Sequence, residues 1–160
     1  MLELPYGMEL KGEVSFKKDA YKTNLTFKED KALVKLDGAY QSQSEDYQIS
    51  VSIDSLQPNH FMPKDSLYWL TASAAIKGKG FDLYSAHTSS LLQATISDIK
   101  YGRNFVSEIQ LNGRLKNHAY ELQLESGYPL ALLKASVSGI LQRNKAEMNL
   151  DAQIEHLNLY

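Results

Sequence analysis

The amino-acid sequence predicts an all-β fold of about ten mainly antiparallel strands in a curved sheet, with no substantial helix. Three observations support this prediction. Apolar and polar residues alternate with a period of two along most of the chain, and no segment shows a helical period. Short polar turns separate the alternating segments, as in an antiparallel meander. One long β unit also occurs twice, which is typical of a repetitive architecture.

The repeat centres on Ile109–Leu115, which resembles Met8–Val14 near the start of the chain. Each segment places a glycine between two large apolar residues. Further matches are Ala20-Tyr21 with Ala119-Tyr120, Leu36-Asp37-Gly38 with Val137-Ser138-Gly139, and Ile49, Val51 and Ile53 with Leu150, Ala152 and Ile154. We therefore expect residues 1–160 to be a single repetitive β segment of a longer protein, with repeats at 8–61 and 109–160 and a spacer at 62–108.

The first part of the chain fits a meander of four strands. They are expected at Met8–Phe16, Tyr21–Phe27, Ala32–Tyr40 and Tyr47–Ile53. Two prolines in Gln57–Lys64 then interrupt the alternation. Asp65 or Ser66 is expected to cap one short helical turn at this point.

The rest of the chain fits six further strands. The fifth begins at Tyr68 and ends in Gly78-Lys79-Gly80, and residues 81–90 form the longest irregular stretch. The others are expected at Leu91–Tyr101, Phe105–Leu115, Tyr120–Leu124, Leu130–Leu141 and Met148–Leu157. The alternation changes phase before Ile99, which predicts a bulge near Ser97-Asp98.

Nearly every expected strand has one apolar face and one polar face, so the sheet has one hydrophobic side. Ten strands exceed what a twisted sheet usually carries without curling, so this side must close on itself or be filled. Glycines recur on the apolar phase, at Gly12, Gly38, Gly78, Gly113 and Gly139. Two compatible interpretations remain open: local curvature around a filled core, or bends that fold the sheet into a trough.

Composition narrows the function classes. The formal net charge of −2 argues against a nucleic-acid surface, which needs a basic stripe. The absence of cysteine excludes a disulfide scaffold and thiolate metal sites. No signal peptide or membrane helix is visible, so any membrane anchor is expected outside this chain.

Motifs for catalysis or cofactor binding are also missing. The four histidines, His60, His87, His118 and His156, are widely separated and lack metal-ligand spacing. Gly78-Lys79-Gly80 does not continue as a nucleotide-binding loop, because Leu83 occupies the third glycine position. We therefore expect no enzyme activity, no catalytic residues, no metal and no cofactor.

Four segments taken in order resemble the TamB family, especially its large Bacteroidetes members, within the wider AsmA-like group. They are Lys77–Leu83 with a G-x-G-x-D element, Ser85–Ser90, Ala94–Gly102 ending in D-x-x-Y-G, and Ile109–Gly113 with I-x-L-x-G. The resemblance covers about residues 30–160. It implies a U-shaped, apolar-lined sheet known as a β-taco, within a periplasmic protein anchored in the inner membrane by a helix that this chain lacks.

The resemblance implies a non-enzymatic role in conducting phospholipid between the inner and outer membranes, with a link to outer-membrane protein assembly. The expected ligand is phospholipid or another acyl-chain molecule, and an outer-membrane assembly protein would bind other parts of the parent chain. The residues expected to face the groove are Leu10, Val14, Val34, Leu36, Val51, Ile53, Leu70, Ile76, Leu111, Leu115, Val137, Leu150 and Ile154. Each of them could equally be ordinary core.

A second reading remains open on the residues alone. A β-sandwich or solenoid module that binds carbohydrate or protein at the cell envelope would show the same alternation. Trp69 and the tyrosines could then stack on sugars, although such residues more often pair across strands. We also expect that the strand ending at Tyr160 could pair with a second copy and form an edge-strand dimer.

Overall fold

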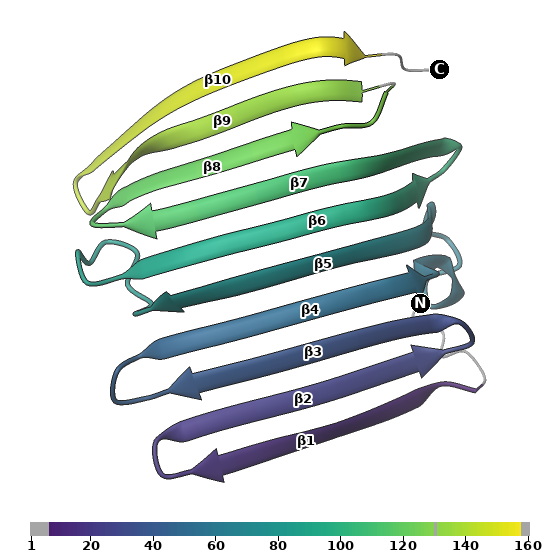
Figure 1. Ribbon diagram of the computed structural model, residues 1–160, viewed down its shortest axis with the longest axis horizontal. Helices are drawn as coiled ribbons and strands as arrows, with labels where there is room; N and C mark the ends of the chain where they lie inside the picture. The colour runs from purple at the N-terminus through teal and green to yellow at the C-terminus, as the bar shows by residue number, and fades with distance from the viewer. Residues whose placement is uncertain (1–6, 130, 158–160) are drawn as a thin grey trace.

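The computed structural model describes residues 7–129 and 131–157, and they form one open sheet of ten antiparallel strands in sequence order (Figure 1). The strands are β1 (Glu9–Lys17), β2 (Ala20–Glu29), β3 (Ala32–Gln41), β4 (Asp46–Leu56), β5 (Leu67–Lys79), β6 (Ser89–Tyr101), β7 (Asn104–Lys116), β8 (Ala119–Ser126), β9 (Ala131–Gln142) and β10 (Lys145–Leu157). The predicted all-β meander is confirmed. The strand end at Tyr160, where pairing with a second copy is expected, lies outside the described residues.

The one helical element of the described residues is a single 3-10 turn, η1 (Pro58–His60), between β4 and β5. The sequence placed a helical turn later, at Asp65 or Ser66, and this prediction was wrong. Pro58 starts the observed turn because its fixed φ suits the first helical position. Asp65 instead accepts a hydrogen bond from the backbone N–H of Leu67, 3.1 Å away, and closes the loop before β5.

The register divides the side chains cleanly between two faces, because cross-strand partners lie on the same face of a sheet. One row crosses all ten strands through Val14, Thr23, Gly38, Ile49, Ile76, Leu92, Gly113, Leu122, Val137 and Leu150. A neighbouring row consists of Glu13, Asn24, Asp37, Ser50, Ala75, Gln93, Asn112, Gln123, Ser136 and Asp151. The first row belongs to the apolar face and the second to the polar face.

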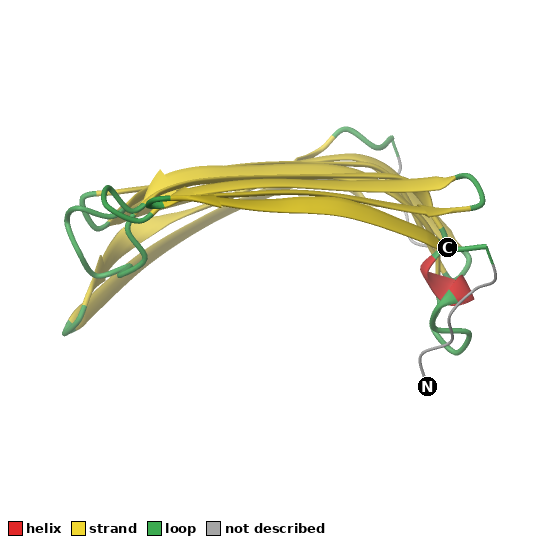
Figure 2. Cartoon of the chain, turned by 90° about the horizontal axis from the view of Figure 1, so that it is seen from below, coloured by secondary structure: helices red, strands yellow, loops and turns green. Residues whose placement is uncertain are grey.

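The sheet is arched, and its strands bend so that the loops after β4 and β5 hang on the concave side (Figure 2). Bulges contribute to this bend at one end of the strands. Register shifts follow Ile53 in β4 and Ile154 in β10, and β6 carries an extra residue at Ser97, as the sequence predicted. Bulges increase local bending and twist. These three follow directly after Ile53, Ile96 and Ile154, which belong to one cross-strand row.

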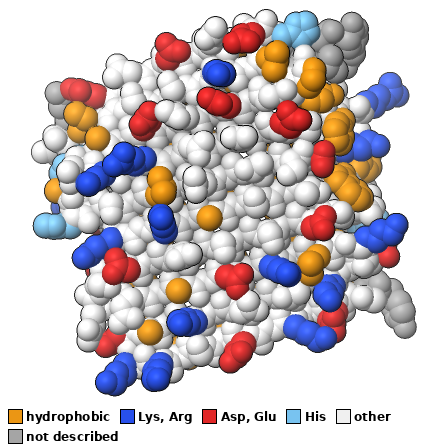
Figure 3. All heavy atoms as spheres, viewed as in Figure 1, with side chains coloured by type: hydrophobic (Ala, Val, Ile, Leu, Met, Phe, Trp, Pro, Cys, Tyr) orange, Lys and Arg blue, Asp and Glu red, His pale blue; other side chains and the backbone are white. Residues whose placement is uncertain are grey.

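The apolar face is not packed against a second layer. Among the described residues no side chain is fully buried, and the large apolar side chains of the sheet are nearly all partly exposed; Ala32 and Leu115, at 4% and 8% exposure, are the exceptions. The interpretation of a filled core is therefore wrong, and the open trough is the arrangement that the structure has. The opposite, convex face carries charged and polar side chains over most of its area (Figure 3).

Candidate functional site: an apolar trough

The floor of the trough is a row that is apolar in every strand. It runs through Gly12, Leu25, Leu36, Val51, Ala74, Ala94, Leu111, Leu124, Ala135 and Ala152. Because strands are spaced about 4.8 Å apart, ten of them give a trough about 43 Å long, measured across the strands. The rows on either side are also mostly apolar. The trough therefore offers a continuous hydrophobic path from β1 to β10.

All the residues that the sequence proposed for the groove lie on this concave face, as the register shows. Their exposure differs strongly along the trough. In the outermost strands Leu10 is 68% exposed and Leu150 is 67% exposed, whereas Leu115 is only 8% exposed. Leu115 is therefore a packing residue, while the outer positions are open. Whether any of these side chains contacts a lipid stays a prediction.

One edge of the trough is lined by a row of aromatic side chains that we call the tyrosine rim, formed by Phe16, Tyr21, Tyr40, Tyr47 and Tyr120. Neighbouring rings touch: the centroids of Phe16 and Tyr21 are 5.2 Å apart, and those of Tyr21 and Tyr40 are 5.9 Å apart. The sequence showed these tyrosines in phase with the apolar positions. It could not show that they share one edge, because that depends on which turns lie together.

The loop between β5 and β6 closes over part of the tyrosine rim. Phe81 stacks on Tyr47 with centroids 5.2 Å apart and an interplanar angle of 17°, and it also contacts Tyr40 at 5.6 Å. The loop is held by the Thr88 hydroxyl, which donates to the Asp82 carbonyl at 2.6 Å. The ion pair of Asp82 with Arg143 joins the loop to the turn before β10.

A hollow of about 650 Å³ lies between Phe81 and the sheet. Its walls are largely apolar and include Val14, Phe16, Leu36, Ile49 and Ile76. Gly38 lies in its floor within a row of larger side chains, and a Cβ atom there would lie 2.9 Å from Cγ2 of Thr23. Lys22 also lines this hollow. A volume of this size falls within the range of small-molecule sites, and its lining suits a hydrocarbon ligand.

Two glycines at the tyrosine rim are covered by tyrosine rings. A Cβ atom on Gly78 would lie 2.6 Å from the Tyr47 hydroxyl oxygen, and one on Gly139 would lie 2.8 Å from that of Tyr120. The Tyr120 hydroxyl donates to the Glu147 carbonyl at 3.3 Å. Each ring therefore shields a strand position that has no side chain of its own.

The opposite rim is covered in part by the loop that contains η1. Phe61 packs against Phe27 with ring centroids 5.7 Å apart. His60 Nδ1 lies 2.8 Å from the Glu29 carboxylate, which is only 5% exposed. This loop covers the acidic group at the end of β2, which is therefore buried at one side of the trough.

The two rims also differ in charge. We compare the charged residues in the two outermost polar rows and in the turns of each rim. At the tyrosine rim the basic residues are Lys17, Lys18, Lys22, Lys77, Lys79, Arg114, Lys116 and Arg143, and the acidic residues are Asp19, Glu45, Asp46, Asp82, Glu121 and Glu147. At the opposite rim Lys11, Lys28, Lys31, Lys35, Lys64, Lys100, Arg103 and Lys134 stand against Glu9, Glu29, Asp30, Asp54, Asp65, Asp98, Glu108, Glu125 and Glu155. Lys11 lowers the pKa of the exposed Glu9 by a hydrogen bond and by its charge. The tyrosine rim is therefore the more basic of the two.

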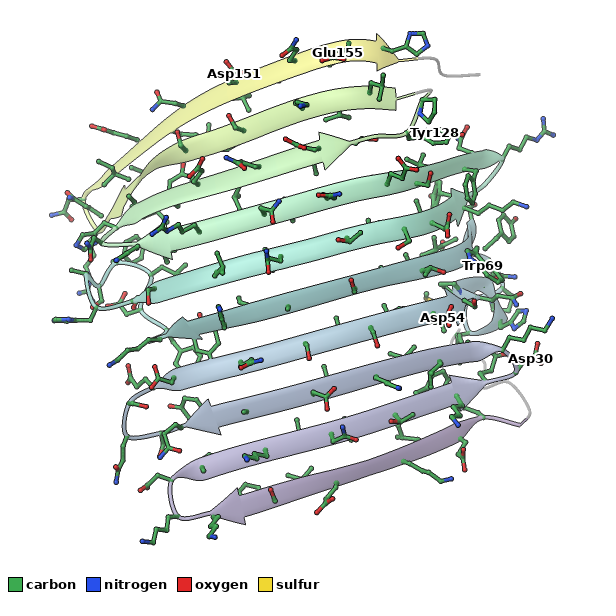
Figure 4. The ribbon with its side chains drawn as sticks, viewed as in Figure 1. Asp30, Asp54, Trp69, Tyr128, Asp151 and Glu155 are labelled. Atoms are coloured by element: carbon green, nitrogen blue, oxygen red, sulfur yellow. The ribbon has the colours of Figure 1, made fainter. Side chains whose placement is uncertain are left out.

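An aromatic group that includes Trp69 and Tyr128 lies on the convex face at the right-hand ends of β5 to β8 (Figure 4). Trp69, Lys100 and Phe105 are cross-strand neighbours, and Phe105 contacts Tyr128 edge-on at 6.5 Å. Gln57 and Asn59 join this group around a shallow hollow of about 420 Å³. The sequence singled out Trp69, but not these neighbours.

Other kinds of site are not found in the described part of the chain. Residues 7–129 and 131–157 contain no cluster of three or more metal-ligating side chains. The same residues include no helix with the length and hydropathy needed to cross a membrane. Comparison with protein-family models, curated proteins and solved structures finds no match in any of the three.

Proposed function

We propose that this chain is a non-enzymatic segment of a lipid conduit, whose concave apolar face carries the acyl chains of phospholipid. The observation that carries the proposal is the uncovered apolar floor that continues from β1 to β10. A protein surface of this kind is rarely left exposed to water, and larger exposed apolar patches mark interaction sites. The alternating pattern keeps the convex face soluble while the concave face stays hydrophobic.

Dimensions and energies favour an acyl chain as the occupant. The hydrocarbon core of a bilayer is about 30 Å thick, so one acyl chain spans about 15 Å. The trough, about 43 Å long, can hold that chain along its axis with room to move. Each buried methylene contributes about 0.8 kcal/mol, so a shielded chain avoids most of the cost of crossing water.

The resemblance to the TamB family adds a cellular setting to this proposal. In that setting the chain belongs to a periplasmic part of an inner-membrane-anchored bacterial protein, and phospholipid passes along it between the inner and outer membranes. An outer-membrane assembly protein would bind other parts of the parent. A second copy could pair with an outer strand, since β1 and β10 each have one unpaired edge.

Mass spectrometry of the natively purified chain tests the proposal. We expect phospholipid to co-purify with the chain and to be displaced by added fatty acid. A denatured sample of the same protein is the control for adventitious lipid. Absence of phospholipid from the native sample, together with no uptake from vesicles of mixed phosphatidylethanolamine and phosphatidylglycerol, would reject the conduit.

The convex aromatic group supports a second candidate, a binding module for carbohydrate. Aromatic faces stack on sugars, and Gln57, Asn59 and Lys100 supply hydrogen-bonding groups beside Trp69. Because Trp69 is the only tryptophan, its fluorescence reports directly on this hollow. A saturable change with cell-wall oligosaccharides would favour the module, and no change with a panel of them would remove it.

A further inference from the structure

We propose that phospholipid lies in the trough in one orientation, with its phosphate at the tyrosine rim and its acyl chains on the apolar floor. This inference rests on the proposed conduit and assigns the subsite for the headgroup. Its key elements are the ring hydroxyls of Tyr21, Tyr40 and Tyr47 and the ammonium groups of Lys17, Lys18 and Lys116.

The tyrosines are suited to the boundary between hydrocarbon and water. Tyrosine has an apolar body and a polar hydroxyl, and it gathers where one side is apolar and the other is wet. The register places Tyr21, Tyr40 and Tyr47 side by side on the concave face. They form the next row of that face after the row of Thr23, Gly38 and Ile49. When the acyl chain of a phospholipid lies on the floor, these rings therefore stand at the point where the headgroup of that lipid reaches water.

Three lysines near this rim are available to a phosphate. Lys17 and Lys116 stand in the outermost polar row at this rim. They directly follow Phe16 and Leu115 in the chain. Their cross-strand neighbours, Ala20 for Lys17 and Ser89 and Ala119 for Lys116, are uncharged. Lys18 lies in the turn between β1 and β2, beyond the end of the sheet at this rim. Within the described residues none of the three lysines takes part in an ion pair.

The opposite rim is less suited to a phosphate. Its concave side is partly covered by the η1 loop, with Phe61 on Phe27. The buried carboxylate of Glu29 lies there beside His60, and Asp30 and Asp54 stand near the same strand ends (Figure 4). Like charge near an anion is unfavourable, so the field across the trough favours the tyrosine rim.

Fluorescence quenching tests the orientation in the whole chain. Trp69→Phe provides a background, into which a single tryptophan is placed by Tyr40→Trp or by Val34→Trp. Both positions are half-buried on the concave face of β3, and they are six positions apart along the strand, or about 20 Å. The probes are a phospholipid with a nitroxide on its headgroup and one with bromines in the middle of an acyl chain.

We expect the headgroup nitroxide to quench tryptophan at position 40 at least about twofold more than at position 34, because nitroxide quenching needs close approach. The brominated chain should quench both. Equal or reversed headgroup quenching with intact bromine quenching overturns the orientation and leaves the conduit standing. No quenching by either lipid at either position rejects the conduit itself.

A charge test separates the phosphate contact from general attraction. The triple variant Lys17→Gln, Lys18→Gln, Lys116→Gln should weaken binding of phosphatidic acid at least about tenfold, since each nearby lysine contributes to anion binding. Its binding of diacylglycerol, which has the same chains without phosphate, should not change. The matched control is Lys28→Gln, Lys31→Gln, Lys100→Gln at the opposite rim. An equal loss of phosphatidic acid in both triple variants overturns the assigned subsite.

Discussion

Two tyrosine rings occupy the space left by glycine in the neighbouring strand. Glycine weakens a strand because it has no side chain to pack, and an aromatic ring from the next strand restores some of that packing. Tyr47 and Gly78 form one such pair, and Tyr120 and Gly139 form the other. In both pairs the close approach of the ring depends on the missing Cβ.

Gly78→Ala should therefore destabilise the sheet by about 1–3 kcal/mol, the usual cost of forcing extra volume into a packed place. A Cβ atom there would lie 2.3 Å from the Ser89 carbonyl oxygen, which is backbone and cannot swing away. Urea unfolding measures the loss. Ser73→Ala, exposed in the same strand, is the control and should change stability by less than about 0.5 kcal/mol. Equal midpoints for the two variants would contradict the account.

The buried carboxylate of Glu29 depends on one side chain from a distant loop. Removing its partner by His60→Ala leaves the carboxylate without the 2.8 Å contact and should cost about 1–3 kcal/mol. Glu29→Gln in the same His60→Ala background removes the buried charge and should recover part of the loss. Thermal unfolding of the single and double variants checks this. A double variant that is no more stable than His60→Ala would show that the charge is not the cause.

At the scale of elements, the strands could be predicted and the loops could not. A period of two fixes strand, face and register together, so the alternation of Val34, Leu36 and Gly38 was sufficient to place β3 and the groove residues. Phe81 lies in a stretch with no period, and its contact with Tyr47 joins segments far apart in the sequence. Likewise, the difference in charge between the two rims appears only when each turn is assigned to its edge of the trough.

Phe81→Ser should release the loop after β5 and remove one wall of the hollow. A ring pair contributes about 0.5–1.5 kcal/mol beyond burial, so the affinity for a fluorescent fatty-acid probe should fall by roughly three- to tenfold. Leu83→Ser is the control, because Leu83 is 53% exposed in the same loop and does not line the hollow. Probe titration of the two variants gives the comparison. If both bind as well as the parent chain, the loop is not part of the site.

At the scale of the whole molecule, a single-layer sheet predicts an unusual response to charge. In a packed core, a buried aspartate loses hydration and unfolds the protein. Here the floor of the trough is open to water, so Leu111→Asp should be tolerated by the fold but should abolish lipid uptake. The adjacent Asn112→Asp adds the same charge on the convex face and should leave uptake unchanged, as the register of β6 to β8 requires.

Circular dichroism and uptake from phospholipid vesicles, measured on both variants, separate the possible causes. A folded Leu111→Asp chain without uptake is the expected result, and Leu36→Asp in β3, four strands before β7, should repeat it. Unfolding of Leu111→Asp would mean that another layer covers the floor in solution. Normal uptake by a folded Leu111→Asp chain would mean that the floor row does not carry the acyl chain. Because Leu36 and Leu111 belong to one row, a conduit requires both substitutions to act alike, whereas two separate binding pockets would allow one to act alone.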